Sequence, residues 1–145
     1  MLFLSFQWRD VAPAEDKETV LRRPDALRFW TDFGRRGDFG WIASRDGVLV
    51  VGAAWCRLLT EDDHGYSFID ERTPCVAIAV ARPERNKGVG GTLLDALKSK
   101  ARELGHERIA LAVETENPAV RLYERHGFVR DQHISGYVRM VASLR

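Results

Sequence analysis

Apolar residues recur with a helical period in one stretch of the chain, and short continuous apolar runs lie on either side of it. The periodic positions are Val89, Leu93, Leu94, Leu97, Ala101 and Leu104. They share one helix face, and Gly105 can end that helix. The runs CVAIAV at 75–80 and RIALAV at 108–113 predict buried strands. A strand, helix and strand in this order predict a crossover with two parallel neighbouring strands.

Weaker patterns fill the part of the chain before this unit. MLFLSFQW at 1–8 predicts a first strand. Residues 12–33 predict two helices separated at Pro24, the second with an apolar face and a stop at Gly34. Residues 39–44 and 48–59 predict a hairpin, because Asp-Gly at 46–47 favours a type I′ turn.

The remaining segments are a loop, a short helix and two strands. TEDDHGYSFIDERTP at 60–74 is polar and predicts a surface loop. Asn117 can cap a short helix that begins at Pro118 and ends at Gly127. FVRD at 128–131 and GYVRMVASL at 136–144 predict the last strands. The fold class expected is α/β (α+β), with a single mixed, mostly antiparallel sheet, a parallel central strand pair and flanking helices, in one domain over residues 1–145.

Composition narrows the function classes. With 22 basic and 21 acidic residues interspersed along the chain and a net charge of +1, no electrostatic footprint for nucleic acid is expected. No apolar run reaches the roughly 20 residues that span a bilayer, and no signal peptide is recognisable, so a cytoplasmic protein is expected. Cys56 and Cys75 lack a metal-binding spacing and are expected to be reduced core thiols, with no metal site.

The glycine-rich stretch RNKGVGG at 85–91 lies between the strand at 75–80 and the helix that begins at Val89. Such a turn presents unpaired backbone N–H groups at the positive end of a helix, which favours an anion. The side chains of Arg82, Arg85 and Lys87 can add positive charge. A tight connection needing glycine for geometry alone is the alternative. The lysine precedes the glycines, unlike a Walker A loop, and Leu93 replaces the glycine of a dinucleotide fingerprint.

Two segments resemble the GNAT superfamily of N-acetyltransferases. Residues 80–94, VARPERNKGVGGTLL, are similar to its acetyl-CoA motif [QR]-x-x-G-x-[GA], and NPAVRLYERHGF at 117–128 resembles its later segment with Asn, Tyr and Gly-Phe. The resemblance implies a GNAT fold and acetyl transfer from acetyl-CoA, as co-substrate, directly to a primary amine of a small molecule or protein. A non-catalytic coenzyme A-binding sensing module and a different acyl group are the alternatives.

The resemblance also implies roles for individual residues. The backbone of residues 85–91 would hold the pyrophosphate, and the pantetheine arm would lie in a gap between strands 75–80 and 108–113. The backbone N–H of Ile78 or Ala79 would face the thioester oxygen, and Tyr123 would protonate the departing thiolate. The complete set of expected cofactor contacts is Ile78, Ala79, Val80, Arg85, Asn86, Lys87, Gly88, Val89, Gly90, Gly91, Thr92, Asn117 and Tyr123.

The general base is less evident, because Cys75 follows Pro74 where relatives often carry glutamate. Glu114 is the first candidate, since ligand crevices form at the C-terminal ends of parallel strands. Asp70 and Glu71 are further candidates, and a water chain is equally possible.

The acceptor pocket is expected near the first two helices, with Trp30 or Phe33 in its wall. The acids at 61–63 and His64 suggest a solvated loop rather than a metal site, or a surface that attracts a cationic amine. The four tryptophans, Trp8, Trp30, Trp41 and Trp55, are expected in or near the core, and C-terminal edge strands make a homodimer plausible.

Overall fold

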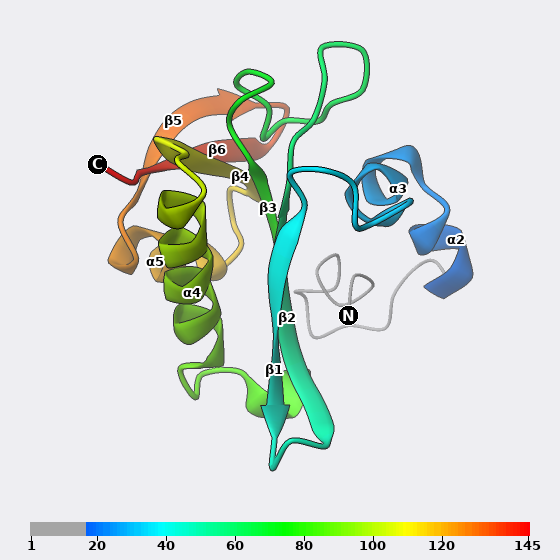
Figure 1. Ribbon diagram of the computed structural model, residues 1–145, viewed down its shortest axis with the longest axis vertical. Helices are drawn as coiled ribbons and strands as arrows, with labels where there is room; N and C mark the ends of the chain where they lie inside the picture. Colours follow the sequence, from blue (N-terminus) through cyan, green and yellow to red (C-terminus); the bar gives the residue numbers. More distant parts are fainter. Residues whose placement is uncertain (1–16) are drawn as a thin grey trace.

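The computed structural model describes residues 17–145 (Figure 1). The predicted first strand and Trp8 lie outside the described residues. The elements are α2 (Lys17–Leu21), α3 (Pro24–Trp30), β1 (Phe39–Arg45), β2 (Leu49–Arg57), β3 (Cys75–Val80), the 3₁₀ turn η1 (Arg82–Glu84), α4 (Val89–Glu103), β4 (Arg108–Glu114), α5 (Ala119–Arg125), β5 (Phe128–Ile134) and β6 (Tyr137–Ser143).

The described strands form one six-stranded sheet in the order β1-β2-β3-β4-β6-β5. All neighbours pair antiparallel except β3 and β4, which are parallel. The predicted mixed sheet with a parallel central pair is therefore confirmed. Helix α4 lies on one side of the sheet and α3 on the other (Figure 1).

Local signals explain most of the element boundaries. Asp46 and Gly47 both have positive φ, 53° and 70°, as the predicted type I′ turn requires. Helix α4 ends at Glu103 and is followed by Gly105 at φ 83°, whose left-handed conformation closes the helix. Helix α3 begins at Pro24 as predicted but ends at Trp30, before the expected stop at Gly34.

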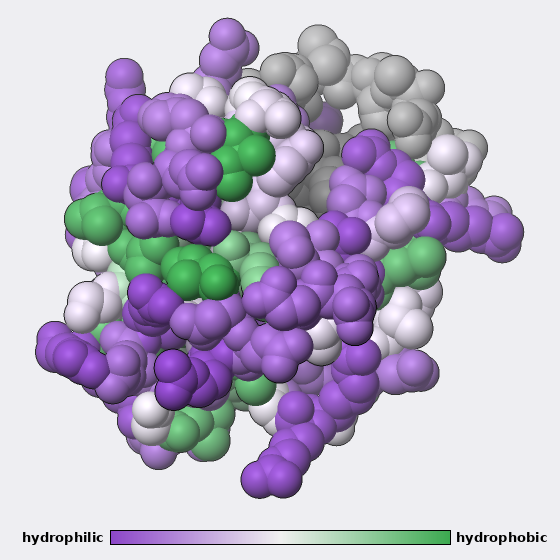
Figure 2. All heavy atoms as spheres, turned by 90° about the horizontal axis from the view of Figure 1, so that it is seen from above, coloured by the Kyte–Doolittle hydropathy of each residue, from purple (hydrophilic) through white to green (hydrophobic). Residues whose placement is uncertain are grey.

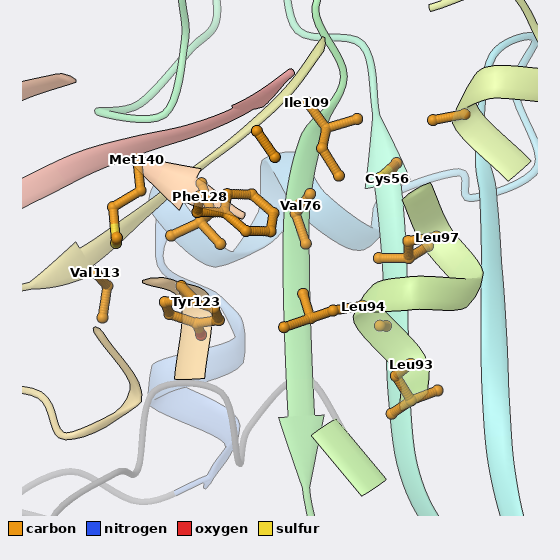
Figure 3. Close-up of a cluster of buried hydrophobic side chains, with 14 of the residues drawn as sticks. Cys56, Val76, Leu93, Leu94, Leu97, Ile109, Val113, Tyr123, Phe128 and Met140 are labelled. Atoms are coloured by element: carbon orange, nitrogen blue, oxygen red, sulfur yellow. The ribbon is translucent and has the colours of Figure 1, made fainter. Parts of the chain in front are cut away.

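The main core lies between the sheet and the helices α4 and α5. Leu94, Leu97, Ile109 and Phe128 are among its most buried side chains (Figure 3). Leu59, Phe68 and Cys75 form a second, smaller cluster beneath the loop at 60–74. Seen from the side of this loop, the surface is mostly hydrophilic, with apolar residues in separate patches (Figure 2).

The prediction that the tryptophans lie in or near the core is wrong for two of them. Trp30 and Trp41 are 43% and 49% exposed. The indole N–H of Trp30 donates to the carbonyl of Leu21 at 3.3 Å, so this ring lies against α2. Trp41 is on β1, the edge strand of the described sheet, where a neighbouring strand lies on one side alone. Trp55 is half-buried, as expected.

Candidate active site

The parallel strands β3 and β4 pair through a single register position, Cys75 with Ala110. There the N–H of Ala110 donates to the carbonyl of Pro74 at 3.0 Å. Strand β3 continues to Val80 and β4 to Glu114, so the two strands separate over most of their length. The other edge of β3 pairs with β2 along all six of its residues. The backbone edge of β3 that faces β4 is therefore left open beyond Cys75.

A cavity of about 420 Å³ lies at this gap. Its floor comes from the middle of β3 and the end of β4, and its walls come from α3, the loop at 60–74, α5 and β6. The lining residues are Asp25, Arg28, Phe29, His64, Gly65, Tyr66, Ser67, Val76, Ala77, Ile78, Leu111, Ala112, Val113, Glu114, Asn117, Tyr123 and Tyr137. Ile78, Glu114, Asn117 and Tyr123 were expected at the site from the sequence.

The glycine loop follows β3 and leads into α4. Asn86 and Gly88 adopt left-handed conformations, with φ of 60° and 86°. Hydrogen bonding within the helix begins at Thr92, whose N–H donates to the Gly88 carbonyl at 3.1 Å. The N–H groups of residues 89–91 precede that bond and have no acceptor within the helix. This is the arrangement that binds anions at a helix N-terminus.

The three glycines of the loop differ in their surroundings. A Cβ at Gly88 would meet nothing within 4 Å, so a ligand can approach this backbone. A Cβ at Gly91 would lie 2.6 Å from Nε2 of His126, and one at Gly90 would lie 3.0 Å from Cδ2 of Leu122. Gly90 and Gly91 therefore permit close packing of α4 against α5 and its C-terminal end. From the sequence, all three glycines were expected to let a ligand approach the backbone. This explanation fits Gly88 best, because the space beside it is open.

Some positive charge around the loop is neutralised by a residue that the sequence did not single out. Glu84 is 8% exposed and accepts from Arg45, and Lys87 Nζ lies 3.8 Å from its carboxylate. The guanidinium Nε of Arg85 donates to the carbonyl of Val80 at 3.2 Å. These contacts order the loop, and they leave its backbone N–H groups as the clearer anion ligands.

Tyr123 and Asn117 are carried into the cavity by α5 and the turn before it. The Oδ1 atom of Asn117 accepts from the N–H of Ala119 at 2.9 Å, so this side chain caps the start of α5, which begins at Ala119, one residue later than predicted. Tyr123 is 8% exposed and packs edge-on against Phe128, with ring centroids 5.9 Å apart (Figure 3). Burial raises the pKa of Tyr123 to about 12, so its phenol is protonated at physiological pH.

The residues considered as the general base differ in whether they line the cavity. Glu114 lines the cavity, whereas Cys75, Asp70 and Glu71 do not. Burial raises the pKa of Cys75 to about 11, as suits a core thiol. Burial alone would raise the pKa of Asp70, but hydrogen bonds from Thr73 and Arg108 lower it to about 2. Asp70 and Cys75 are therefore poor proton acceptors, and Glu114 is the carboxylate of this set that reaches the cavity.

The acceptor-side wall differs from the one expected. Phe29 lines the cavity, whereas Trp30 and Phe33 are exposed and do not. Phe33 lies instead beneath the guanidinium of Arg57, 5.5 Å from its ring centroid. His64 lines the cavity and stacks on Phe68 with centroids 4.3 Å apart, so it is not merely a solvated loop residue.

Polar side chains of β2 hold α3 in this wall. Arg57 is 1% exposed and donates to both carboxylate oxygens of Asp38, at 3.0 and 2.7 Å. It also donates to the carbonyls of Arg28 and Thr31, at 3.1 and 2.6 Å, and Trp55 Nε1 donates to the carbonyl of Phe29 at 2.9 Å. These donors satisfy carbonyls at the end of α3 that lack helical partners.

Sequence reasoning missed several cavity residues, among them Asp25, Arg28, Tyr66 and Tyr137. Tyr66 lies in a polar loop and Tyr137 at a strand start, positions that carry no motif. All three tyrosines of the chain line the cavity, but no spacing in the sequence connects Tyr66 with Tyr137.

Comparisons with known proteins agree with this geometry. The family model described as "Acetyltransferase (GNAT) family" matches residues 5–128. Mycothiol acetyltransferase of Corynebacterium aurimucosum is 28% identical over 111 residues, which are 75% of this chain and 32% of that protein. An N-alpha-acetyltransferase of Saccharolobus solfataricus is 41% identical over 64 residues, 43% of this chain and 38% of that protein. The chain thus spans about a third of the length of these curated relatives.

Solved structures share the fold. A GNAT-family acetyltransferase of Staphylococcus aureus Mu50 superimposes with a TM-score of 0.70 at 17% identity, covering 99% of this chain and 89% of that one. The Salmonella typhimurium protein yncA, solved with its cofactor acetyl-CoA, has a TM-score of 0.63 at 23% identity, covering 95% and 78%. In the part of the chain described here, no helix has the length and apolar character needed to cross a membrane.

Proposed function

The chain belongs to the acetyltransferase (GNAT) family, and from this premise we propose that it is an N-acetyltransferase that moves an acetyl group from acetyl-CoA to a primary amine. The observation that carries the proposal is the cavity between the separating strands β3 and β4, where Glu114, Asn117 and Tyr123 meet. Acetyl transfer to an amine needs an acid for the departing thiolate and an acceptor for the ammonium proton.

The described residues fit acetyl-CoA, which when bound supplies an acetyl group activated as a thioester. The N–H groups at the start of α4, beside the open Gly88, suit the pyrophosphate. The open edge of β3 around Ile78, Ala79 and Val80 suits the amide groups of a pantetheine arm. Asn117 has its Oδ1 engaged by the helix cap, and its Nδ2 is the group suited to donate toward that arm.

Tyr123 is the proposed acid. Its phenol holds its proton at physiological pH because burial raises its pKa to about 12. A thiolate, whose conjugate thiol has a pKa of about 8.5, is stabilised by a hydrogen bond from a phenol placed against it as the carbon–sulfur bond breaks. The raised pKa makes Tyr123 the weaker acid of the two, so its role is to donate this hydrogen bond, with the proton shared during bond breaking. The raised pKa also means that Tyr123 does not ionise between pH 6 and 9, so any basic limb of the rate profile in that range must have another origin.

Glu114 is the proposed base, at the mouth of the cavity and at the C-terminal end of β4. A carboxylate here can accept the ammonium proton directly or through a water molecule. It also stabilises the cationic form of the amine on arrival, which favours binding.

The test is titration calorimetry with acetyl-CoA beside a thiol-release assay over a panel of amines. Tyr123→Phe is expected to bind acetyl-CoA with wild-type affinity and to lower kcat by about 10²–10⁴-fold, the usual contribution of a positioned acid. Glu114→Gln is expected to lower kcat, whereas Glu116→Gln, an exposed control two residues away, is not.

Each outcome of that test has a defined meaning. Binding without turnover on any amine would favour a coenzyme A-binding sensing module. Failure to bind acetyl-CoA would contradict the proposal outright. The length of acyl chain accepted, a homodimeric state and a cytoplasmic location stay predictions, which acyl-CoA competition, analytical ultracentrifugation and cell fractionation would test.

A further inference from the structure

Two tyrosines that have no part in the proposed chemistry form one wall of the cavity. Tyr66 comes from the loop at 60–74 and Tyr137 from the first position of β6, and both line the cavity. Their rings lie with centroids 5.0 Å apart at an interplanar angle of 37°. The face of a tyrosine ring attracts an ammonium group, and the attraction strengthens where water is excluded.

Two carboxylates flank this aromatic pair. Glu114 is the direct cross-strand partner of Tyr137 in the β4–β6 register, so their Cβ atoms are neighbours. Asp25 enters the same cavity from α3. Burial raises the pKa of Tyr137, and the charges of Glu114 and Asp25 raise it further, which places both carboxylates within electrostatic range of its hydroxyl.

The charges of the opposite sign at this wall already have partners. Arg28 lines the cavity, and its Nε lies 3.2 Å from the carboxylate of Asp63. Arg23 pairs with Asp25 at 2.9 Å, but these two side chains are 45% and 41% exposed, so a ligand ammonium can compete at low cost. Asp63 offsets the charge of Arg28, through a contact that uses Nε and a carboxylate that is itself 66% exposed.

The aromatic pair is held by contacts from the sheet. Both the N–H and the Oγ1 of Thr115 donate to the carbonyl of Gly136, each at 3.0 Å, which fixes the turn before Tyr137. Arg139 Nη1 donates to the carbonyl of Phe68 at 2.7 Å, two residues beyond Tyr66. Because these contacts already hold the two rings in place, little conformational freedom is lost in this wall when a ligand binds.

We infer that Tyr66, Tyr137 and Asp25 form, with Glu114, the subsite for the acceptor's ammonium group, and that it selects primary amines whose α-carbon carries no carboxylate. The inference rests on the proposed function and adds the class of acceptor. An ammonium gains from the ring faces and the two carboxylates. A carboxylate on the same carbon is repelled by Asp25 and Glu114, and the charge of Arg28 is offset by Asp63.

Phenylethylamine, phenylalaninamide, the tripeptide Phe-Ala-Ala and phenylalanine share one side chain and differ next to the amine, so their kcat/KM values isolate the α-substituent. The corresponding leucine series repeats the test with an aliphatic side chain. In each series the members without an α-carboxylate are expected to exceed the free amino acid at least tenfold. Comparison of the amide with the tripeptide distinguishes a small free amine from a peptide N-terminus as the source of this group.

Variants test whether these residues contribute to binding of the amine. Asp25→Asn and Tyr137→Leu are expected to raise the amine KM about tenfold, while the KM for acetyl-CoA stays unchanged. Asp32→Asn, in an exposed residue just after α3 that does not line the cavity, is the matched control and is expected to leave the amine KM unchanged. Thermal unfolding of each variant identifies loss of fold, and in that case Tyr137→Phe, which keeps the ring, should restore both fold and KM.

The results that overturn the inference differ from those that overturn the proposed function. Turnover of the amino acids at a rate equal to or above that of their amides would overturn the inference. So would an unchanged amine KM in Asp25→Asn and Tyr137→Leu, or turnover confined to amines outside both series. Absence of acetyl-CoA binding, or of thiol release with every amine tested, would contradict the acetyltransferase proposal itself.

Discussion

The two sides of the cavity are built in different ways. The donor side, which comprises the loop at 85–91 and the helices α4 and α5, comes from one continuous stretch of sequence and packs through buried apolar side chains. The acceptor side, which comprises α3, the loop at 60–74 and the β5–β6 turn, brings together segments far apart in the chain. Its segments are held by hydrogen bonds from arginine, tryptophan and threonine side chains and by the small apolar cluster against which Phe29 packs.

The difference indicates that the two sides of the cavity tolerate substitution to different degrees. Close packing around Gly90 and Gly91 constrains the donor side where α4 meets α5, because protein interiors tolerate little change of volume. The acceptor side depends on a few polar contacts to backbone carbonyls, which accept a donor whatever side chain the residue carries. The residues that line the cavity on this side can therefore change while the hydrogen bonds to the backbone remain.

The largest effect on stability is expected at Arg57, whose hydrogen bonds hold α3 on the acceptor side. Arg57→Met removes the cationic partner of Asp38, whose side chain is 2% exposed, and leaves a buried charge held by the backbone N–H groups of Gly34 and Arg35. We expect the free energy of unfolding, measured by urea denaturation, to fall by about 3–5 kcal/mol. Arg36→Met, in an exposed neighbour, is the control. Equal effects of the two changes would show that the polar anchors contribute little.

The next effect tests the packing of the donor side. Gly91→Ala places a methyl group against the ring of His126, whose Nδ1 lies 2.9 Å from Oδ1 of Asp95. We expect a loss of about 1–3 kcal/mol in unfolding free energy. Gly90→Ala should cost less, because its nearest neighbour is the flexible end of Leu122. The packing explanation fails if Gly90→Ala proves the more damaging change.

A smaller effect is expected at the open glycine of the same loop. Gly88→Ala meets no neighbouring atom but must adopt a φ of 86°, which costs an alanine about 1 kcal/mol. Because asparagine tolerates this conformation, Gly88→Asn should recover part of the loss in thermal unfolding. A wild-type melting temperature for Gly88→Ala would mean that the loop relaxes.

The smallest effect depends on pH and involves the end of the loop at 60–74. Asp70 pairs with Arg108 at 2.6 Å, and its folded-state pKa of about 2 lies below the ordinary value of 3.8. A depressed pKa stabilises the fold above the unfolded value, and this contribution is lost as pH falls from about 4 towards 2. Both side chains are more than a third exposed, so solvent screens the pair and the gain is modest.

Denaturation of wild type and Asp70→Asn between pH 2 and pH 7 measures this contribution. The variant should be slightly less stable than wild type at pH 7, and the difference should disappear near pH 2. A difference that is constant across this range would contradict an electrostatic origin.

Much of the donor side could be predicted because its signals are local. The helical period from Val89 and the cap at Asn117 each depend on residues a few positions apart, as does the Asp-Gly turn between β1 and β2, outside the donor side. The order of these elements then determines the parallel pair through the handedness of crossovers. The roles of individual residues toward acetyl-CoA stay predictions.

The acceptor side could not be predicted from such signals. Phe29 rather than Trp30 lines the cavity, because the indole of Trp30 is hydrogen-bonded to the carbonyl of Leu21. Tyr66 and Tyr137, whose rings are in contact, come from a loop and from a strand far apart in the chain. The burial of Arg57 depends on carbonyls at the end of α3. Long-range polar contacts of this kind leave no periodic pattern, so composition and spacing carry no trace of them.

The hydrogen bond from Trp55 to the Phe29 carbonyl gives the molecule a built-in optical reporter. Trp55 is half-buried, and Phe29 forms part of the cavity wall. Any movement of that wall changes the polarity around the Trp55 indole and hence its emission maximum. Among the tryptophans that the structure describes, Trp30 and Trp41 are the more exposed, at 43% and 49%, so their emission should respond less. Intrinsic fluorescence can therefore follow acceptor binding without a label, and Trp55→Phe should reduce the change.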